Sequence, residues 1–133
     1  MNWQAEIHIK PIPKGRPRFT RCGIAYTPAK TREFEKAIGD LYQGEPLKGQ
    51  LSVNVEFRFK VFDSYSKKKK IALIEQHWNS SRSLGDLDNL LKAVLDGLNG
   101  VAFEDDSQVV EINAAKYWGD EDLIRIEVKE IER

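Results

Sequence analysis

Apolar and polar residues alternate in several stretches of the chain, which is the pattern of a β-strand with one buried face. The clearest stretch is LSVNVEFRFKVF at residues 51–62, where every second side chain from Leu51 to Val61 is apolar. Its length predicts a strand at the centre of a sheet. Shorter strands are predicted at residues 3–9, 23–26, 108–118 and 123–131.

Two connections between these strands carry signals of their own. The turn sequence GDED at residues 119–122 separates the last two strands, which predicts that they form an antiparallel hairpin. Residues 23–26 follow a basic Pro/Gly segment and are predicted to be the return arm of a hairpin with a basic tip.

A period of 3.6 residues predicts helices elsewhere. The strongest begins at Leu87, with Asp86 at its N-cap position, and ends at Gly97 with Asn99-Gly100. Its apolar face comprises Leu87, Leu90, Leu91, Val94, Leu95 and Leu98. A second helix follows Thr27-Pro28 and runs to residue 43, and a third begins at the lysines from residue 67. These elements predict one small domain over residues 1–133 of the α/β (α+β) class, a mixed, mostly antiparallel sheet packed with two to three helices.

The composition is that of an ordinary globular protein and excludes several other classes. No apolar run approaches the ~20 residues of a membrane span, and residues 1–10 lack the apolar core of a signal peptide. The single cysteine, Cys22, excludes an intrachain disulfide framework and is typical of a reducing cytoplasm, where we expect the protein to act. One cysteine and two histidines also make a zinc site a poor interpretation.

The net charge of zero hides a segregation of charge along the chain. Residues 1–36 contain eight basic and three acidic side chains, and residues 58–82 contain seven and two. Residues 83–133 contain five basic and thirteen acidic side chains. The first two segments therefore predict a surface for a polyanion and the third a surface for cations, with an unevenly charged solvated surface as the alternative.

Two short basic segments are candidates for contact with nucleic acid, with solvated charge as the alternative for each. The first, IPKGRPRFTR at residues 12–21, is a stiff loop that suits phosphate contact and base stacking around Phe19. Its cationic side chains are Lys14, Arg16, Arg18 and Arg21. The second segment is predicted as a mobile polybasic loop, since lysines at a helix start oppose the macrodipole. It consists of Lys67, Lys68, Lys69 and Lys70.

Acidic side chains gather on and after the helix at Leu87. Asp88, Lys92 and Asp96 recur at intervals of four on the edge opposite the apolar face, with Asn89 beside them. A second cluster, Glu104-Asp105-Asp106, follows the helix. Like charges this close repel unless a cation lies among them. Oxygen ligands from two places with a lysine between them therefore predict a magnesium-dependent phosphodiester enzyme.

Two simpler interpretations of these acids compete with a magnesium site. Asp86 taken alone is an N-cap and Asp88 a charge that favours the helix dipole, but neither role explains Asp105-Asp106, which precede no predicted helix. A calcium-binding EF-hand loop is excluded, because the sixth residue from Asp86 is Leu91 and the twelfth is Gly97.

The acidic region also carries a resemblance to a known family. GDLDNLLKAVLDGLNG, with the EDDSQVV that follows it, resembles the signature of the RusA family of Holliday junction resolvases, small endonucleases common in prophages. The segments PIPKGRPRFTR and YTPAKTREFE resemble members from phages and Gram-positive hosts. The resemblance covers most of the chain and implies a homodimer of mixed α/β fold. Such a dimer would cut four-way DNA junctions symmetrically, with Mg²⁺ or its substitute Mn²⁺, in DNA recombination and repair.

The resemblance further implies roles for individual residues. It assigns metal binding to Asp86, Asp88 and Asp106 and the essential positive charge to Lys92, and these four are the expected catalytic residues. Asp96 and Asp105 match further recurrent acids, and Asp105 is included among the expected metal ligands. The chain differs from some relatives in a shorter turn before Asp105 and in its four lysines, which bears on substrate preference.

Two other functions stay open on the sequence. One is a non-catalytic nucleic-acid-binding module, and the other is a general phage nuclease that cuts forks and flaps as readily as junctions. A four-way junction presents two equivalent strands, whereas one chain supplies one acidic cluster, so paired cutting requires two copies related by a two-fold axis. The surfaces offered for this dimer are the edge strands near either terminus and the small helix face at Ala93 and Gly97.

Overall fold

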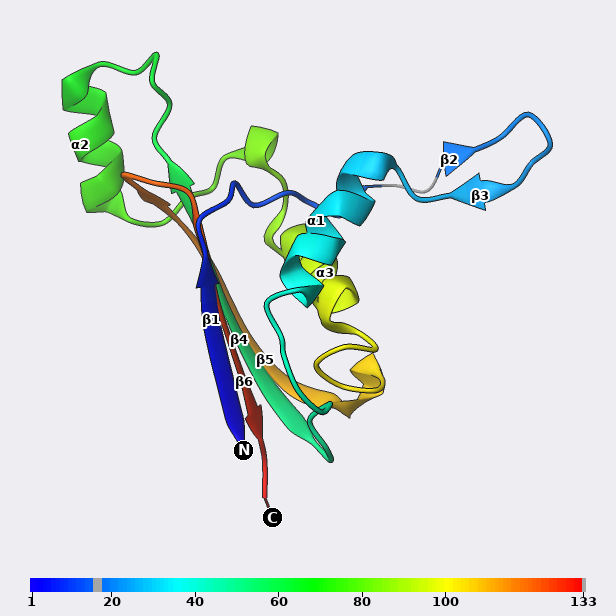
Figure 1. Cartoon of the computed structure of the whole chain (residues 1–133). Coiled ribbons are helices and arrows are strands. Elements are labelled where there is room, and N and C mark those ends of the chain that lie inside the picture. Colours follow the sequence, from blue (N-terminus) through cyan, green and yellow to red (C-terminus); the bar gives the residue numbers. More distant parts are fainter. Residues whose placement is uncertain (16–17, 133) are drawn as a thin grey trace.

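The computed structural model describes residues 1–15 and 18–132, and it has the predicted α+β architecture (Figure 1). The strands are β1 (Asn2–Ile7), β2 (Arg18–Phe19), β3 (Ala25–Tyr26), β4 (Leu51–Lys60), β5 (Val109–Gly119) and β6 (Leu123–Glu130). The helices are α1 (Ala29–Gly39), α2 (Lys67–Gln76) and α3 (Leu87–Leu98), with short 3-10 helices η1 (Arg82–Leu84) and η2 (Asp106–Gln108). Of the predicted basic residues, Arg16 lies outside the described residues. Nowhere in the described ranges does a helix have the length and apolar character needed to cross a membrane.

Four strands form one mixed sheet in the order β1-β6-β4-β5, and β4 has a neighbour on each side. It runs antiparallel to β6 and parallel to β5. Alternate side chains of β4 are completely buried, among them Leu51, Val53 and Val55. The prediction of a central strand with one buried face is therefore confirmed, although the strand ends at Lys60, two residues before the predicted end.

The predicted hairpin of the last two strands is wrong, because β4 lies between β5 and β6. The connection from β4 to β5 contains two helices, and such a crossover brings β5 back parallel to β4. Residues 119–122 then cross the end of β4, where the Asp122 carboxylate accepts a hydrogen bond from the Lys60 amide at 2.9 Å. The last strand, β6, therefore lies between β1 and β4, and the prediction that the strand near the C-terminus is an edge available to the dimer is wrong.

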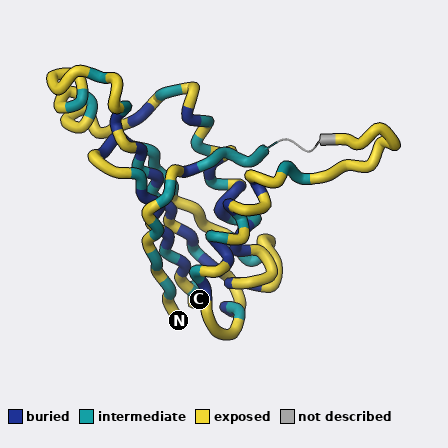
Figure 2. Tube along the Cα trace, turned by 45° about the horizontal axis from the view of Figure 1, so that its top comes forward, coloured by how far each residue is buried: buried dark blue, intermediate teal, exposed yellow. Residues whose placement is uncertain are grey.

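Helices α1 and α3 pack together on one face of the sheet, and their contact explains two of the glycines (Figures 1 and 2). A Cβ atom on Gly39 would lie 2.8 Å from the Gly97 carbonyl oxygen, and one on Gly97 would lie 2.8 Å from the Glu35 carbonyl oxygen. Ala93 is also buried, with 1% of its surface exposed. The small face at Ala93 and Gly97 is thus occupied within the chain, and the prediction that it offers a dimer surface is wrong.

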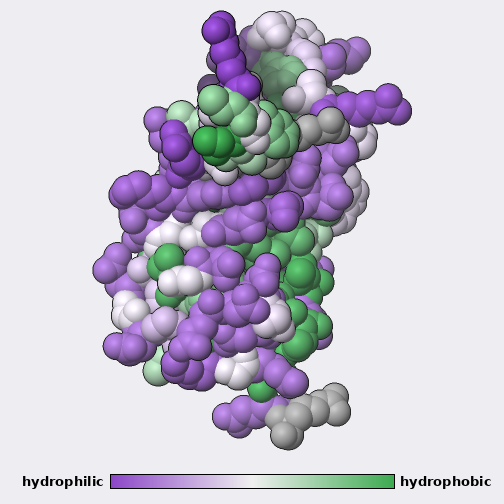
Figure 3. All heavy atoms as spheres, turned by 90° about the vertical axis from the view of Figure 1, so that its right-hand side faces the viewer, coloured by the Kyte–Doolittle hydropathy of each residue, from purple (hydrophilic) through white to green (hydrophobic). Residues whose placement is uncertain are grey.

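The β2–β3 hairpin and α2, which contain parts of the two basic segments, extend from the body at the end of the molecule where α3 begins (Figure 1). The strands β2 and β3 form the predicted hairpin, and Phe19 and Ile24 are 69% and 65% exposed on it. Figure 3 looks onto this hairpin and shows apolar atoms among hydrophilic side chains. The four lysines form the first turn of α2 and not a mobile loop, because the Ser66 side chain caps the helix through the Lys69 amide.

Candidate active site

The start of α3 presents two of the expected metal ligands. Asp86 is at the N-cap position, but its carboxylate makes no capping hydrogen bond. Asp88 lies in the first turn, and its Oδ1 accepts a hydrogen bond from the Asn89 amide at 2.9 Å. Both aspartates are exposed, as is Lys92 one turn further along. The fully buried Leu90, Val94 and Leu98 hold the helix on the core, which leaves these polar side chains facing solvent.

The N-terminal basic segment packs against this helix through Lys14. The Lys14 amide donates to the Asn89 carbonyl at 3.0 Å, and its ammonium pairs with Asp96 at 2.9 Å and with Glu35 of α1. Burial disfavours the charged ammonium, but the hydrogen bonds and charges of Glu35 and Asp96 outweigh this and raise the pKa of Lys14. The charge of Lys14 is therefore balanced within the protein, and its expected contact with DNA stays a prediction.

The Lys14 ion pairs stabilise the fold in a pH-dependent way. Replacing Lys14 with Met leaves two carboxylates without a cation, so we expect the free energy of unfolding at pH 7 to fall by about 1–3 kcal/mol. Because the folded-state pKa is raised, this contribution is complete below the unfolded value of about 10.4 and is lost as pH rises through the folded pKa. Urea unfolding at pH 7 and above pH 11 measures both effects.

The matched control for Lys14→Met is Lys36→Met, since the Lys36–Asp40 pair on α1 is largely exposed. Its loss should change the stability little at either pH. An equal loss of stability in the two variants would mean that the Lys14 ion pairs contribute no more than a surface pair.

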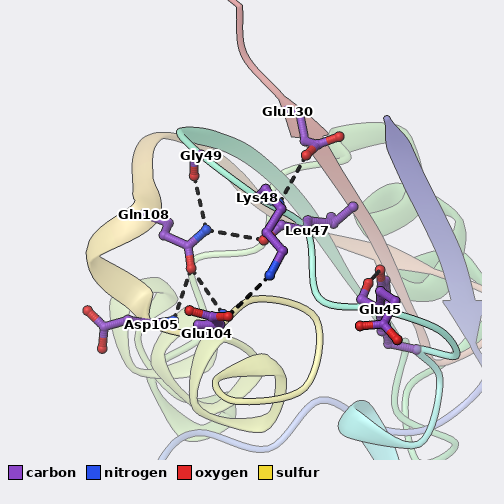
Figure 4. A network of polar contacts seen from close by, with 9 residues as sticks. Glu45, Leu47, Lys48, Gly49, Glu104, Asp105, Gln108 and Glu130 are labelled. Carbon is purple, nitrogen blue, oxygen red and sulfur yellow. Dashed lines mark hydrogen bonds and ion pairs between the residues drawn. The ribbon is translucent and has the colours of Figure 1, made fainter.

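The second acidic cluster is held by a side chain that the sequence analysis overlooked, Gln108 (Figure 4). Its Oε1 accepts hydrogen bonds from the Glu104 and Asp105 amides at 3.0 and 3.1 Å. Its Nε2 donates to the Leu47 and Gly49 carbonyls at 3.2 and 3.0 Å. All four hydrogen bonds of the amide are made, so Gln108 fixes the loop before β5.

The two aspartates of this loop have different environments. Asp105 caps η2 by accepting a hydrogen bond from the Ser107 amide at 3.1 Å, and the hydrogen bonds from Ser107 hold the pKa of the Asp105 carboxyl below its usual value. Asp106 is exposed and is the first residue of η2. Asp105 thus has a structural role in addition to its expected role as a ligand, which stays a prediction.

The two acidic groups lie at opposite ends of α3 (Figure 1). Asp86 and Asp88 are at its start, whereas the turn that leads to Asp106 is bonded to its last residue, with the Ala102 amide donating to the Leu98 carbonyl at 2.9 Å. A helix of 12 residues is about 18 Å long. Accordingly, no three His, Cys, Asp or Glu side chains of residues 1–15 and 18–132 are grouped so that they could hold a metal ion.

A second residue overlooked in the sequence, Lys116 of β5, lies beside Asp86. Its ammonium donates to the Ser81 and Gly85 carbonyls at 2.9 and 2.7 Å and so fixes the segment that leads into α3. Burial lowers the pKa of Lys116, and the nearby charge of Asp86 opposes part of that decrease. In the sequence, Lys116 cannot be distinguished from a surface lysine on a half-buried strand. Its structural role is therefore seen only in the folded protein.

Comparison with known proteins agrees with this chemistry. The family model of endodeoxyribonuclease RusA matches residues 8–129, which include both acidic groups and the Lys14 segment. The chain belongs to the RusA family. This RusA nuclease is also 29% identical to "Uncharacterized protein YqaN" of Bacillus subtilis (strain 168), over 94% of each chain.

Family membership establishes the class of reaction. RusA proteins are endodeoxyribonucleases that hydrolyse phosphodiester bonds and act on Holliday junctions, so this chain is an enzyme and not a non-catalytic binding module. The exposed carboxylates Asp86, Asp88 and Asp106 suit a divalent cation, because hard cations take oxygen ligands and share them with phosphate oxygens. The oxygen ligands are of the type that magnesium prefers. Within one chain, however, Asp106 is too far from Asp86 and Asp88 for the three to bind one ion.

Proposed function

We propose that this RusA nuclease resolves four-way DNA junctions by paired, Mg²⁺-dependent nicks, as a two-fold dimer whose active sites are shared between subunits. Asp86 and Asp88 of one subunit would bind magnesium together with Asp106 of the partner subunit. The observation that supports this is the separation of the two acidic groups at the ends of α3, since one chain does not bring three ligands together among its described residues.

The free edge of β5 is the surface that best supports such a dimer. Residues 77–79 cover its end, because the Asn79 amide donates to the Lys116 carbonyl at 3.0 Å and Trp78 bridges to Tyr117. Before that point, no other described segment pairs with the outer edge of β5. Two large apolar side chains, Val110 and Ile112, are 57% and 47% exposed there. An uncovered edge with exposed apolar residues favours pairing with another strand.

Antiparallel pairing of two β5 edges would complete both active sites at once. With the two-fold axis near Ile112, the start of one strand lies beside residues 113–116 of the other. Asp106 immediately precedes β5, and Lys116 neighbours Asp86. Asp106 of the partner subunit would therefore approach Asp86, and the two-fold axis would produce the same contact in reverse.

The dimer surface is tested by placing a charge at the centre of the β5 edge. We expect Ile112→Lys to sediment as a monomer and to lose cleavage, because two lysines would face each other across the axis. Ile71→Lys is a matched control, since Ile71 lies on α2 and is 49% exposed, close to the 47% exposure of Ile112. A dimer that persists in Ile112→Lys would exclude this surface.

The chemistry assigned to the chain's own residues is positioning and charge neutralisation. Magnesium, when bound, neutralises the scissile phosphate and orients it for attack by water. Lys92 lies one turn from Asp88 on the same exposed edge of α3, so its ammonium can approach the same phosphate. A fixed positive charge at that place stabilises the negative charge that develops in the transition state.

The two basic segments would position the DNA. The β2–β3 hairpin and α2 extend on either side of the end of the molecule at which α3 begins (Figures 1 and 2). Arg21 is exposed on the hairpin, and all four lysines of α2 lie in its first turn. DNA seated over Asp86 and Asp88 would therefore meet positive charge on both sides.

Neutralising the α2 lysines should weaken junction binding without changing the cleavage step. With Lys67, Lys68 and Lys70 changed to Gln, we expect the slope of log Kd against log salt to become shallower by roughly one unit per lost phosphate contact. Lys69 is left unchanged because its ammonium lies 3.8 Å from the centre of the Tyr65 ring. Fluorescence anisotropy in Ca²⁺ at several salt concentrations gives the slope, and an unchanged slope would mean that these lysines do not contact DNA.

The proposed function is tested directly with a labelled four-way junction, a fork and a flap. Paired nicks in the junction with Mg²⁺ or Mn²⁺, none in EDTA and slow cutting of the other substrates are expected. Equal rates on all three substrates would instead identify a general branched-DNA nuclease, and binding without nicking in either metal would contradict the proposal.

A further inference from the structure

A cleft of about 590 Å³ opens beside Asp86, on the side where Asp106 of the partner subunit would approach. Its walls are residues 76 and 78–82, Asp86 and Leu87 at the start of α3, and residues 113–116 of β5. The volume is in the range of pockets that hold small organic ligands. Because Asp86 is one of its lining residues, a molecule in this cleft would lie next to the reacting phosphate.

One wall of the cleft contains a buried donor without an acceptor. Asn79 is only 6% exposed, and its Nδ2 makes no hydrogen bond to any of the described residues. Its orientation is set, because the Oδ1 accepts a hydrogen bond from the Ser81 amide at 2.9 Å and turning the amide over would break that bond. A buried donor left without an acceptor is unfavourable, which favours a ligand that brings one. The Nδ2 atom has less than 1 Å² of accessible surface, so the Asn79 side chain must move slightly for that ligand to reach it.

The neighbouring residue offers an aromatic surface. Trp78 lines the cleft and is 61% exposed. Its ring is nevertheless supported, with edge-to-face contacts to His77 at 4.8 Å and to Tyr117 at 6.1 Å between ring centroids. A fixed and open indole is a suitable platform for a nucleobase, since every base has a π-face.

The remaining polar groups of the cleft suit a sugar-phosphate. Arg82 is an exposed cation at its wall, and Lys116 adds a second positive charge close to Asp86. Together with the Asn79 donor and the Trp78 ring, these groups match an aromatic ring that carries acceptors at its edge and a nearby anion.

We propose that this cleft binds one unstacked nucleotide of the branched DNA, the one adjoining the scissile phosphate, with its base on Trp78 and an acceptor of its edge on Asn79 Nδ2. The inference rests on the proposed function, because it takes Asp86 as part of the active site. Nucleotides at a branch point are less costly to unstack than those within a duplex, so such a cleft selects branched over continuous DNA.

The test combines a change in the protein with a change in the DNA. Once the cleavage position is mapped, junctions are made with a tetrahydrofuran abasic residue on either side of it. We expect Trp78→Ala to lower kcat/KM on the intact junction roughly 10- to 100-fold, and the abasic residue on one side to lower wild-type cleavage by a similar factor. The two changes together should lower it no further, because each removes the same stacking contact.

Matched variants separate stacking from structural damage. Trp78→Phe should retain most of the activity. Asn79→Asp keeps the hydrogen bond from Ser81 but replaces the free donor by an acceptor, so it should lose most of the activity. Asn54→Asp on the exposed face of β4 is the control and should cut at the wild-type rate. Thermal melts check folding, and if Asn79→Asp does not fold, the Trp78 cycle still decides.

The effects of Trp78→Ala, of the abasic residue and of both together are also measured on the Kd in Ca²⁺. This second measurement separates the cleft proposal from the proposed function. A wild-type chain that binds junctions but cuts none contradicts the proposed function, and the abasic and Trp78→Ala effects on Kd then decide the cleft independently. Factors that multiply in the double change, or a Trp78→Ala variant that binds and cuts as the wild type does, would overturn the cleft proposal.

Discussion

Mixing the Asp88→Asn and Asp106→Asn variants is expected to restore nicking of a four-way junction that neither variant cuts alone. Each variant by itself should lose about 10³-fold or more in rate, because both sites of its dimer lack a ligand for the metal. In a mixed dimer, one site combines both substitutions and the other combines Asp88 of one subunit with Asp106 of the other. About a quarter of the sites are therefore intact after random exchange at equal concentration.

The nature of the product makes this experiment more specific. A mixed dimer has a single working site, so it should nick one strand and leave the junction unresolved, whereas wild type should cut both. Mixing Asp86→Asn with Asp88→Asn is the matched control, since these two ligands come from the same subunit and no intact site is formed. Absence of nicking in the Asp88→Asn and Asp106→Asn mixture, with subunit exchange confirmed, would place all ligands of a site in one chain.

Replacing Lys92 with Ala should reduce cleavage by about 10²- to 10³-fold while the Kd for the junction in Ca²⁺ changes by less than about threefold. The reason is that Lys92 is assigned to the charge that develops in the transition state, and many other cations contribute to binding. Single-turnover cleavage at saturating protein measures the chemical step by itself.

Lys129→Ala serves as the matched control for Lys92→Ala, because Lys129 is an exposed lysine on β6, paired with Glu127. It should leave both the rate and the Kd close to those of wild type. If Lys92→Ala weakens binding as much as it slows cleavage, Lys92 contacts the DNA in the ground state and has no special role in the transition state.

Elements formed by local periodicity were predictable from the sequence. The alternation in β4 and the 3.6-residue period of α3 each reflect one buried face, so Val53 and Leu90 are buried as expected. The order of the strands was not predictable, because it depends on the crossover that brings β5 parallel to β4. Sequence neighbours on either side of a tight turn suggest a hairpin, but here the end of β4 lies between them.

For the candidate site, the residue types were predictable and their grouping was not. Asp88 and Lys92 lie on one exposed helix edge because four residues make about one turn. The separation of Asp106 from Asp88 depends on the path of the loop after α3, which Gln108 fixes by contacts to residues distant in sequence. The ion pairs of Lys14 were likewise not predictable, because its partners Glu35 and Asp96 are distant in sequence and lie on two different helices.

The pairing of β1 with β6 has a consequence for how the enzyme is made in the cell. In the sheet β1 has β6 as its neighbour, and Asn2 pairs with Lys129, so β1 can pair only after β6 has been synthesised. At about 5–20 residues per second, this interval lasts roughly 6 to 25 seconds. Once β4 has been made, one of its edges also stays unpaired until β6 follows. The four-stranded sheet that supports both acidic groups is therefore completed only after β6 has been synthesised.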